Sequence, residues 1–326
     1  MTARRFVSVL LAIWAACCIG AYFYSQHQNI PLHTAAAILP AFLLEAAFYI
    51  VLGSESVRTR LETRVPRPLF ALLLAASALA PYCVYTLALH CFHPAAFWSL
   101  AALVAAACFW YVVLPHIAAI DVVFVALMAA AVLAKVFARI YPSPLPHLRL
   151  EILGTLMWIR VGAFALLSIR RVQGIGFGFF PTRKDWFTGI LYYVLFLPVG
   201  AGLAFAIHFA QYHAPIMPWW KISLVAAGTF VGFLWVTALG EEFLFRGLLQ
   251  QWFSTWLASD FAGLLCASVL FGLVHLFHNF PNWKFAVMAG AAGVFYGIAF
   301  RQAKSIRASM VTHALVVTTW RLFLSS

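Results

Sequence analysis

The chain has 326 residues, of which 65% are hydrophobic and 9% are charged, and its mean hydropathy is +0.95. A soluble domain carries roughly 25% charged residues, so this composition excludes a soluble globular protein and indicates a polytopic membrane protein. The net charge of +12 comes from short clusters of Lys and Arg between apolar segments. That pattern follows the positive-inside rule and disfavours nucleic acid as a partner.

About eleven apolar segments approach the ~20 residues that a helix needs to cross a bilayer. They span residues 6–24, 34–53, 69–89, 96–114, 117–137, 150–169, 187–210, 221–240, 261–278, 284–300 and 309–325. Some of them can be re-entrant or interfacial. We therefore expect an all-α, polytopic transmembrane helical bundle of about 8–11 spans. Strands are improbable, because a membrane barrel would show alternating segments of about ten residues.

The first apolar segment follows Arg4 and Arg5, and no small-residue cleavage site comes after it. We interpret it as a retained helix and not as a signal peptide. A cytoplasmic N-terminus then places the basic loops 54–68, 170–186 and 301–308 on the cytoplasmic side. The sequence thus predicts a multi-pass protein of the cell membrane, with the lipid bilayer as its surroundings.

The longest polar break, residues 170–186, divides the chain into two parts. We expect residues 1–186 to form an N-terminal transmembrane region of unknown role, and residues 187–326 to carry the chemistry. The glycine-rich run 174–178 in this loop has no strand before it, so it does not predict a phosphate-binding site. Four polar residues in the apolar segments either pair across helices or line a cavity: Glu45, Asp121, Lys135 and Arg160.

Two adjacent glutamates, Glu241 and Glu242, lie within the apolar C-terminal part. A carboxylate at the bilayer centre costs roughly 2.5–3.5 kcal/mol, so such residues usually mark function. Arg246 follows Glu242 by one helical turn, and the two can form an ion pair. Glu241 lies about 100° further around the helix. It has no local partner, so it is either free for chemistry or paired with another helix.

Histidines follow in two later segments. His275 comes four residues after Phe271, Asn279 lies one turn beyond it, and His313 lies in the last segment. Each imidazole can be a satisfied core residue or part of a site, since a buried imidazole needs a partner. Antiparallel packing of neighbouring helices would bring His275 to Glu241. The sequence contains no HExxH or GxSxG motif, and we expect neither a metal nor a cofactor.

The ordered set Glu241-Glu242-x-x-x-Arg246, Phe271-x-x-x-His275 and His313 resembles the CPBP family. This family comprises the type II CAAX prenyl endopeptidases and their bacterial relatives, also called glutamic intramembrane proteases or ABI family proteins. The resemblance covers residues 220–325. It implies a metal-independent intramembrane endopeptidase that acts on a peptide or a membrane protein.

The resemblance also implies roles for the residues. Glu241 and His275 match the glutamate and histidine taken to activate a water, and Glu242 matches the glutamate that pairs with Arg246. His313 matches the oxyanion-binding histidine, but Val317 stands where the family has asparagine or a similar polar residue. Loss of one oxyanion donor costs roughly 10²–10³ in rate. The valine therefore predicts a slow enzyme, a substitute donor such as Asn279 or Thr318, or no activity.

Two other functions remain open from the sequence. Val317 is consistent with a non-catalytic membrane scaffold or immunity protein of the same fold. A metal-dependent membrane hydrolase is the other alternative, because carboxylate and imidazole ligands suit zinc. Its ligands would be Glu241, Glu242, His275 and His313.

Overall fold

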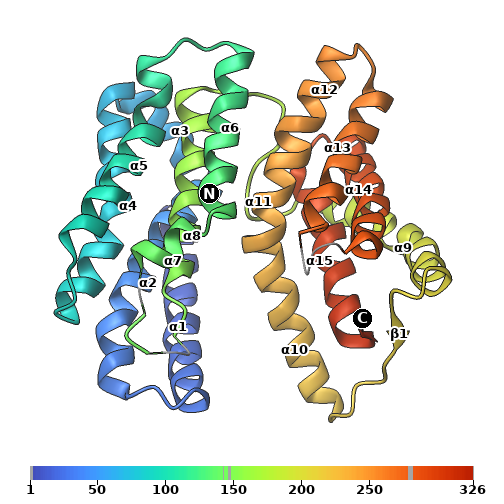
Figure 1. The fold of residues 1–326 in the computed structure, drawn as a ribbon, viewed down its shortest axis with the longest axis horizontal. Coiled ribbons are helices and arrows are strands. Elements are labelled where there is room, and N and C mark those ends of the chain that lie inside the picture. Colours follow the sequence, from blue (N-terminus) through green and yellow to red (C-terminus); the bar gives the residue numbers. More distant parts are fainter. Residues whose placement is uncertain (1–2, 142, 146–147, 278–281, 326) are drawn as a thin grey trace. The chain divides into compact units, whose positions relative to one another are not determined.

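The computed structural model describes residues 3–141, 143–145, 148–277 and 282–325, and these form an all-α membrane protein (Figure 1). Within this part of the chain, eight helices are long and apolar enough to cross a membrane, and the shorter apolar helices Ala118–Leu133 and Asp260–His275 accompany them. The expected polytopic helical bundle is therefore confirmed. A two-residue antiparallel ladder departs from the all-helical expectation: it joins β1 (Gln211–Tyr212) to β2 (Leu324–Ser325).

The chain folds as two compact units, Met1–Gln173 and Gly174–Ser326. The division falls inside the polar break at 170–186. The N-terminal unit contains α1 (Ala3–His27), α2 (Leu32–Gly53), α3 (Glu55–Arg64), α4 (Arg67–Ala88), α5 (Pro94–Val113), α6 (Ala118–Leu133), α7 (Val136–Ile140) and α8 (Glu151–Phe164), which continues as the π-helical turn η1 (Ala165–Ile169). Helix α8 packs against α2, α4 and α5 and forms the centre of this unit.

The apolar segment 117–137 forms a shorter helix than expected. Helix α6 ends at Leu133, and Lys135 adopts a left-handed backbone with φ of 52° before α7 begins. That conformation is unfavourable for a residue with a Cβ and cannot continue a right-handed helix. Lys135 is exposed at this break instead of buried within a span.

The other polar residues of the N-terminal spans pair across helices. Arg160 on α8 donates from Nε and Nη2 to the two carboxylate oxygens of Glu45 on α2, at 2.8 and 3.0 Å. Both side chains are 1% exposed. Arg170 binds Asp121 in the same bidentate way, at 2.9 Å for both bonds. Two-point pairing satisfies charges that would otherwise be costly inside an apolar bundle.

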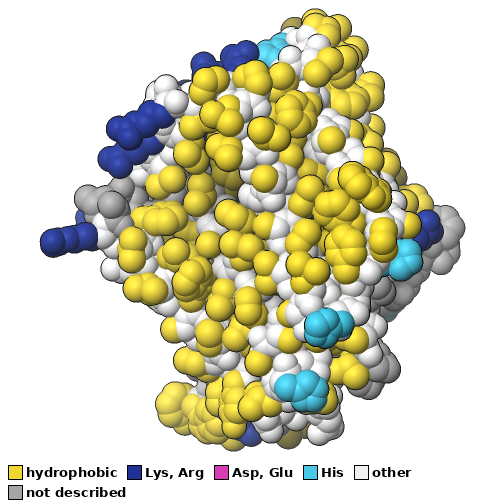
Figure 2. Space-filling view, turned by 90° about the vertical axis from the view of Figure 1, so that its left-hand side faces the viewer, with side chains coloured by type: hydrophobic (Ala, Val, Ile, Leu, Met, Phe, Trp, Pro, Cys, Tyr) yellow, Lys and Arg dark blue, Asp and Glu magenta, His cyan; other side chains and the backbone are white. Residues whose placement is uncertain are grey.

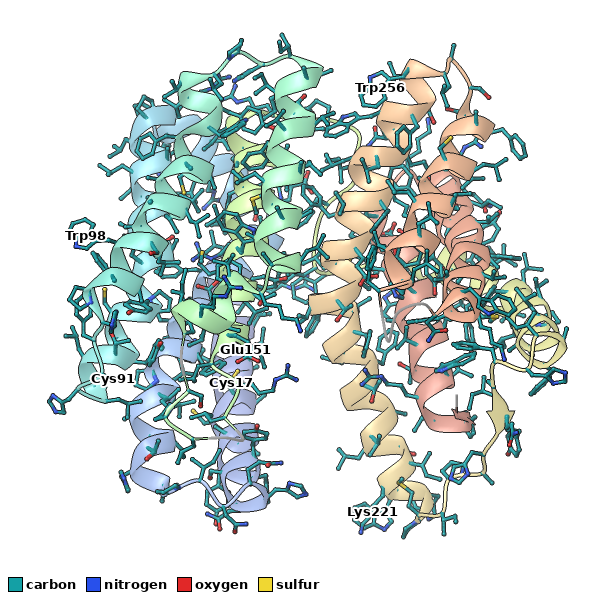
Figure 3. The ribbon with its side chains drawn as sticks, viewed as in Figure 1. Cys17, Cys91, Trp98, Glu151, Lys221 and Trp256 are labelled. Atoms are coloured by element: carbon teal, nitrogen blue, oxygen red, sulfur yellow. The ribbon has the colours of Figure 1, made fainter. Side chains whose placement is uncertain are left out.

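The outer surface of the N-terminal unit suits a lipid environment. Figure 2 shows a face on which hydrophobic side chains predominate and Lys and Arg lie at the margins. Large apolar side chains point outward from α4 and α5, including Leu72 and Trp98, which are 55% and 68% exposed. Trp98 projects away from its own bundle in Figure 3. An apolar exterior of this kind is favourable only against hydrocarbon.

The C-terminal unit is built around one long helix. It contains α9 (Arg183–Ala206), β1, α10 (Trp219–Gly232), η2 (Phe233–Thr237), α11 (Ala238–Glu242), η3 (Phe243–Gln250), α12 (Gln251–Trp256), α13 (Asp260–His275), α14 (Trp283–Ala303), α15 (Ile306–Phe323) and β2. Segments α10 to α12 are continuous over 38 residues. Lys221 and Trp256 lie at its opposite ends in Figure 3.

The expected end of a span at residue 240 was therefore wrong. The helix continues through both glutamates to Trp256, with π-helical turns at η2 and η3. No proline interrupts it, and one oxygen of its buried carboxylate, Oε1 of Glu242, is bound by partners from within the unit. At 1.5 Å per residue the helix is roughly 57 Å long, more than the ~30 Å hydrocarbon core. The glutamates thus lie in its interior and not at a helix end.

Close contacts with α9 and with the segment around Gly176 hold helix α15 in place. A Cβ at Gly189 on α9 would lie 2.6 Å from Cβ of Val311 on α15, and Thr312 donates to the Gly189 carbonyl at 2.9 Å. Small residues allow such backbone approach between membrane helices. Gly176, with φ of +61°, packs on the start of α15, where Ser305 Oγ donates to its carbonyl at 3.1 Å. These contacts set the position of α15.

Candidate active site

Glu242 is the centre of a buried polar cluster. Its Oε1 accepts a hydrogen bond from Nη1 of Arg246 at 3.0 Å and lies 2.8 Å from Nδ1 of His313. The Glu242 side chain is 0% exposed, and those of Arg246 and His313 are 1% and 6% exposed. Because a carboxylate oxygen accepts, Nδ1–H of His313 is the donor. Glu242 therefore pairs with Arg246, as the spacing predicts, and also orients an imidazole 71 residues away.

The Arg246 guanidinium joins three helical segments. Its Nη2 donates to the carbonyl oxygen of Gly293 on α14 at 3.0 Å. Its Cζ lies 4.5 Å from the ring centroid of Phe271 on α13 and 5.2 Å from that of Tyr296 on α14. A Cβ at Gly293 would lie 3.1 Å from Nη2, so glycine permits this approach. Hydrogen bonds and aromatic faces together compensate the buried cation.

The His313 ring is held in a fixed orientation. It stacks on Tyr296 with centroids 4.7 Å apart and an interplanar angle of 16°, and it meets Phe271 edge-on at 5.9 Å. With Nδ1 bound to Glu242, the opposite nitrogen Nε2 faces Glu241, and its distance to Oε2 is 3.9 Å. That distance is too long for a hydrogen bond. A single water can contact both atoms across it.

Glu241 differs from Glu242 in its surroundings. Its side chain is 33% exposed. Its Oε2 atom is buried and has no hydrogen-bond partner among the described residues, and the same holds for Oε2 of Glu242. Unsatisfied carboxylate oxygens are unusual in a protein interior, where they commonly await a water or a ligand. Both unsatisfied oxygens belong to one site.

His275 joins this cluster through Phe271. Its Nδ1 lies 2.7 Å from the Phe271 carbonyl oxygen, one turn earlier on α13. The Phe271 ring contacts both imidazoles, since its centroid is 4.6 Å from that of His275 and 5.9 Å from that of His313. Among the described residues, no hydrogen bond links His275 to Glu241. Asn279 lies outside the described residues.

Both threonine hydroxyls next to Val317 have hydrogen-bond partners. Thr318 donates its Oγ1–H to the Ala314 carbonyl at 2.7 Å, and Thr319 is bonded to the Tyr193 hydroxyl at 2.7 Å. Hydroxyls that bond their own helix in this way are common in apolar helices. Thr318 is therefore already engaged, and it does not stand out as the expected substitute donor.

Tyr296 also belongs to this cluster, although its sequence context does not predict it. Nothing local distinguishes this tyrosine from the other aromatic residues of the apolar spans. Its place between Gly293 and Gly297, where α14 approaches its neighbours closely, is the one signal that the sequence offers. Its stack on His313 depends on the packing of α14 against α15.

The possible metal ligands do not form a metal site in the described part of the chain. Within the described ranges, no group of three or more His, Cys, Asp or Glu side chains is placed to hold a metal ion. Of the four ligands considered from the sequence, Glu242 has its Oε1 shared between Arg246 and His313.

A known protein family matches this part of the chain. Residues 224–319 match the family model described as Type II CAAX prenyl endopeptidase Rce1-like. The matched segment includes both glutamates, Arg246, Tyr296 and both histidines. No curated protein and no solved structure gives a significant match to the chain.

Proposed function

We propose that this chain, whose residues 224–319 match the Type II CAAX prenyl endopeptidase Rce1-like family model, hydrolyses a peptide bond with a water activated by Glu241. The match supports an intramembrane protease in a multi-pass membrane protein. The observation that carries the mechanism is the unsatisfied Oε2 of Glu241, 3.9 Å from Nε2 of an imidazole that Glu242 orients.

The charge of the cluster supports these roles. Glu241 and Glu242 as carboxylates, with Arg246 as a cation, sum to one negative charge. The proposed mechanism uses His313 as an imidazolium, which brings the sum to zero. In that state Nδ1–H donates to Glu242, and Nε2–H is free to donate to a developing oxyanion.

The proposed reaction proceeds in two steps. Glu241 takes a proton from water, and the hydroxide oxygen bonds to the peptide carbonyl carbon, while the carbonyl oxygen gains the negative charge. His313 donates a hydrogen bond to this oxygen. The tetrahedral intermediate then collapses, the C–N bond breaks, and the proton held by Glu241 passes to the leaving amine. The products are a carboxylic acid and an amine.

His275 takes the role of a second group acting on the water. Its Nδ1 is bound at the Phe271 carbonyl, which makes Nε2 the basic nitrogen of the neutral ring. Its edge contact with Phe271 keeps the ring beside the cluster. The substrate class is a peptide or a membrane protein, and no step uses a metal or a cofactor.

The N-terminal unit has no role in this reaction as written. We place the protein in the cell membrane with its N-terminus in the cytoplasm, as the distribution of basic loops indicates. The N-terminal region then anchors the protease part and presents an apolar surface to lipid.

The decisive test replaces Glu241 with glutamine. Membrane proteins from cells that carry wild-type protein and from cells that carry Glu241→Gln are compared for a peptide terminus that disappears. The corresponding peptide is then incubated with purified protein in vesicles. We expect Glu241→Gln to lose at least about 10²-fold in kcat, because the base is removed. The matched control is Glu151→Gln, which alters a carboxylate whose partner Arg149 is 73% exposed.

A non-catalytic scaffold is the second candidate, and Val317 favours it, since a hydrocarbon side chain cannot donate to an oxyanion. For that candidate, Glu241→Gln protein supports the cellular phenotype of the intact gene, and no terminus changes. Equal turnover by wild-type and Glu241→Gln protein would overturn the protease proposal.

A further inference from the structure

The proposed oxyanion site lacks a donor at Val317. His313 supplies one hydrogen-bond donor through Nε2, and the next turn of α15 presents Val317 on the same side of the helix. The hydroxyls of Thr318 and Thr319 are bonded to Ala314 and Tyr193. A tetrahedral oxyanion is normally held by more than one donor, and a neighbouring helix can supply the second one.

Tyr296 on α14 lies beside His313, the residue one turn before Val317. Its side chain is 2% exposed, and its ring stacks on His313 at 4.7 Å and 16°. The stack fixes the phenol beside the imidazole that faces Glu241. The Arg246 guanidinium lies 5.2 Å from the same ring and holds it from the other helix. Two independent contacts therefore set the orientation of this tyrosine.

The Tyr296 hydroxyl has spare hydrogen-bonding capacity. In the described part of the chain it makes no hydrogen bond, although the hydroxyl of a buried tyrosine usually finds a partner. The Tyr296 ring contacts the His313 imidazole and the Arg246 guanidinium, which are the two groups that bind Oε1 of Glu242. A phenol is a donor as well as an acceptor, and it remains neutral in the ground state. A neutral O–H on a ring that stacks on His313 can donate to negative charge that develops beside that imidazole.

We propose that the Tyr296 hydroxyl is the second oxyanion donor and replaces the polar side chain that Val317 lacks. This inference rests on the proposed protease function. It deepens that function by naming a further catalytic residue, which acts together with Nε2 of His313. The tyrosine and the histidine reach the oxyanion from adjacent helices, α14 and α15, which pack directly on one another.

The test uses Tyr296→Phe, which removes the hydroxyl and keeps the ring that stacks on His313. We expect kcat to fall by roughly 10²–10³-fold, the usual effect of losing one oxyanion donor, with KM changed less than about threefold. Tyr193→Phe is the matched control. It removes a hydroxyl that is bonded to Thr319 in the same unit, and we expect its kcat to stay within about threefold of wild type.

Rescue separates a catalytic role from a structural one. Val317→Asn introduces an amide donor one turn after His313, so in the Tyr296→Phe background it should restore at least about tenfold in kcat. Full activity of Tyr296→Phe would overturn the proposal, and so would a loss that Val317→Asn leaves unrepaired. The melting temperature of each variant, measured in the same detergent, shows whether the fold is kept.

The same assay distinguishes failure of this inference from failure of the proposed function. Wild type and Glu241→Gln are measured beside the tyrosine variants. If wild type does not exceed Glu241→Gln, the protease function itself has failed. If wild type is active and Tyr296→Phe equals it, only the role of Tyr296 has failed.

Discussion

At the residue scale, one carboxylate organises the site. A single oxygen of Glu242 accepts hydrogen bonds from both Arg246 and His313. Removal of Arg246 therefore changes the charge and the geometry around His313, and removal of His313 changes them around Arg246. Breaking one side of a buried ion pair leaves an uncompensated charge, which costs more than the intact pair contributes. Glu241 lies next to this arrangement with one oxygen unsatisfied, and in the proposed reaction its position depends on the rigidity of its neighbour.

Arg246→Met tests this dependence. The change leaves Glu242 buried without its cation, so we expect the free energy of unfolding to fall by about 3–5 kcal/mol. The matched control is Arg301→Met, which breaks the Arg301–Asp260 pair, whose side chains are 40% and 69% exposed. An exposed pair contributes about 0–1 kcal/mol. Thermal unfolding in detergent measures both, and equal losses would contradict the assigned role of Arg246.

At the element scale, helix α15 carries His313, and its position depends on contact with α9. Gly189 and Val311 bring these helices together, and the Thr312 hydroxyl bridges them at the Gly189 carbonyl. The start of α15 is held by the turn at Gly176. A small shift of this helix would move Nε2 of His313 relative to Glu241, because helices transmit displacements along their length.

Gly189→Ala should therefore destabilise the unit and lower activity together. The added Cβ would lie 2.6 Å from Val311 and 2.8 Å from the Ala308 carbonyl, and overpacking of this kind costs about 1–3 kcal/mol. Gly202→Ala on the same helix meets nothing within 4 Å. We expect it to be neutral or to stabilise by up to about 1 kcal/mol, since alanine favours helix. A similar melting temperature for the two variants would show that the α9–α15 contact is not tight.

At the scale of the whole molecule, two helical units each bury their own ion pairs. The Glu45–Arg160 pair lies at the centre of the N-terminal unit, and the Glu242–Arg246 pair lies at the centre of the C-terminal unit. Both are inside apolar helices, where isolated charges would be costly. The family match at 224–319 covers only the second pair. The Glu45–Arg160 pair lies outside this segment, and the proposed reaction does not use it.

The intact protein should be insensitive to chelators, since the proposed reaction uses the side chains alone. Turnover in vesicles is measured before and after incubation with EDTA and after dialysis. We expect turnover to change by less than about twofold, because no step of the proposed reaction uses a metal ion. Loss of turnover that added Zn²⁺ restores would instead favour the metal-dependent hydrolase. Metal analysis of the purified, active protein provides the independent control.

The sequence by itself determined the class of the fold and the local part of the site. Composition specifies membrane helices, and one helical turn specifies the Glu242–Arg246 pair, because both depend on neighbours along the chain. Only the tertiary structure decided that the helix continues past the glutamates, that His313 binds Glu242, and that Tyr296 stacks on His313. Those contacts join residues on different helices. Their register is set by close approaches such as Gly189 on Val311, which no spacing within one segment encodes.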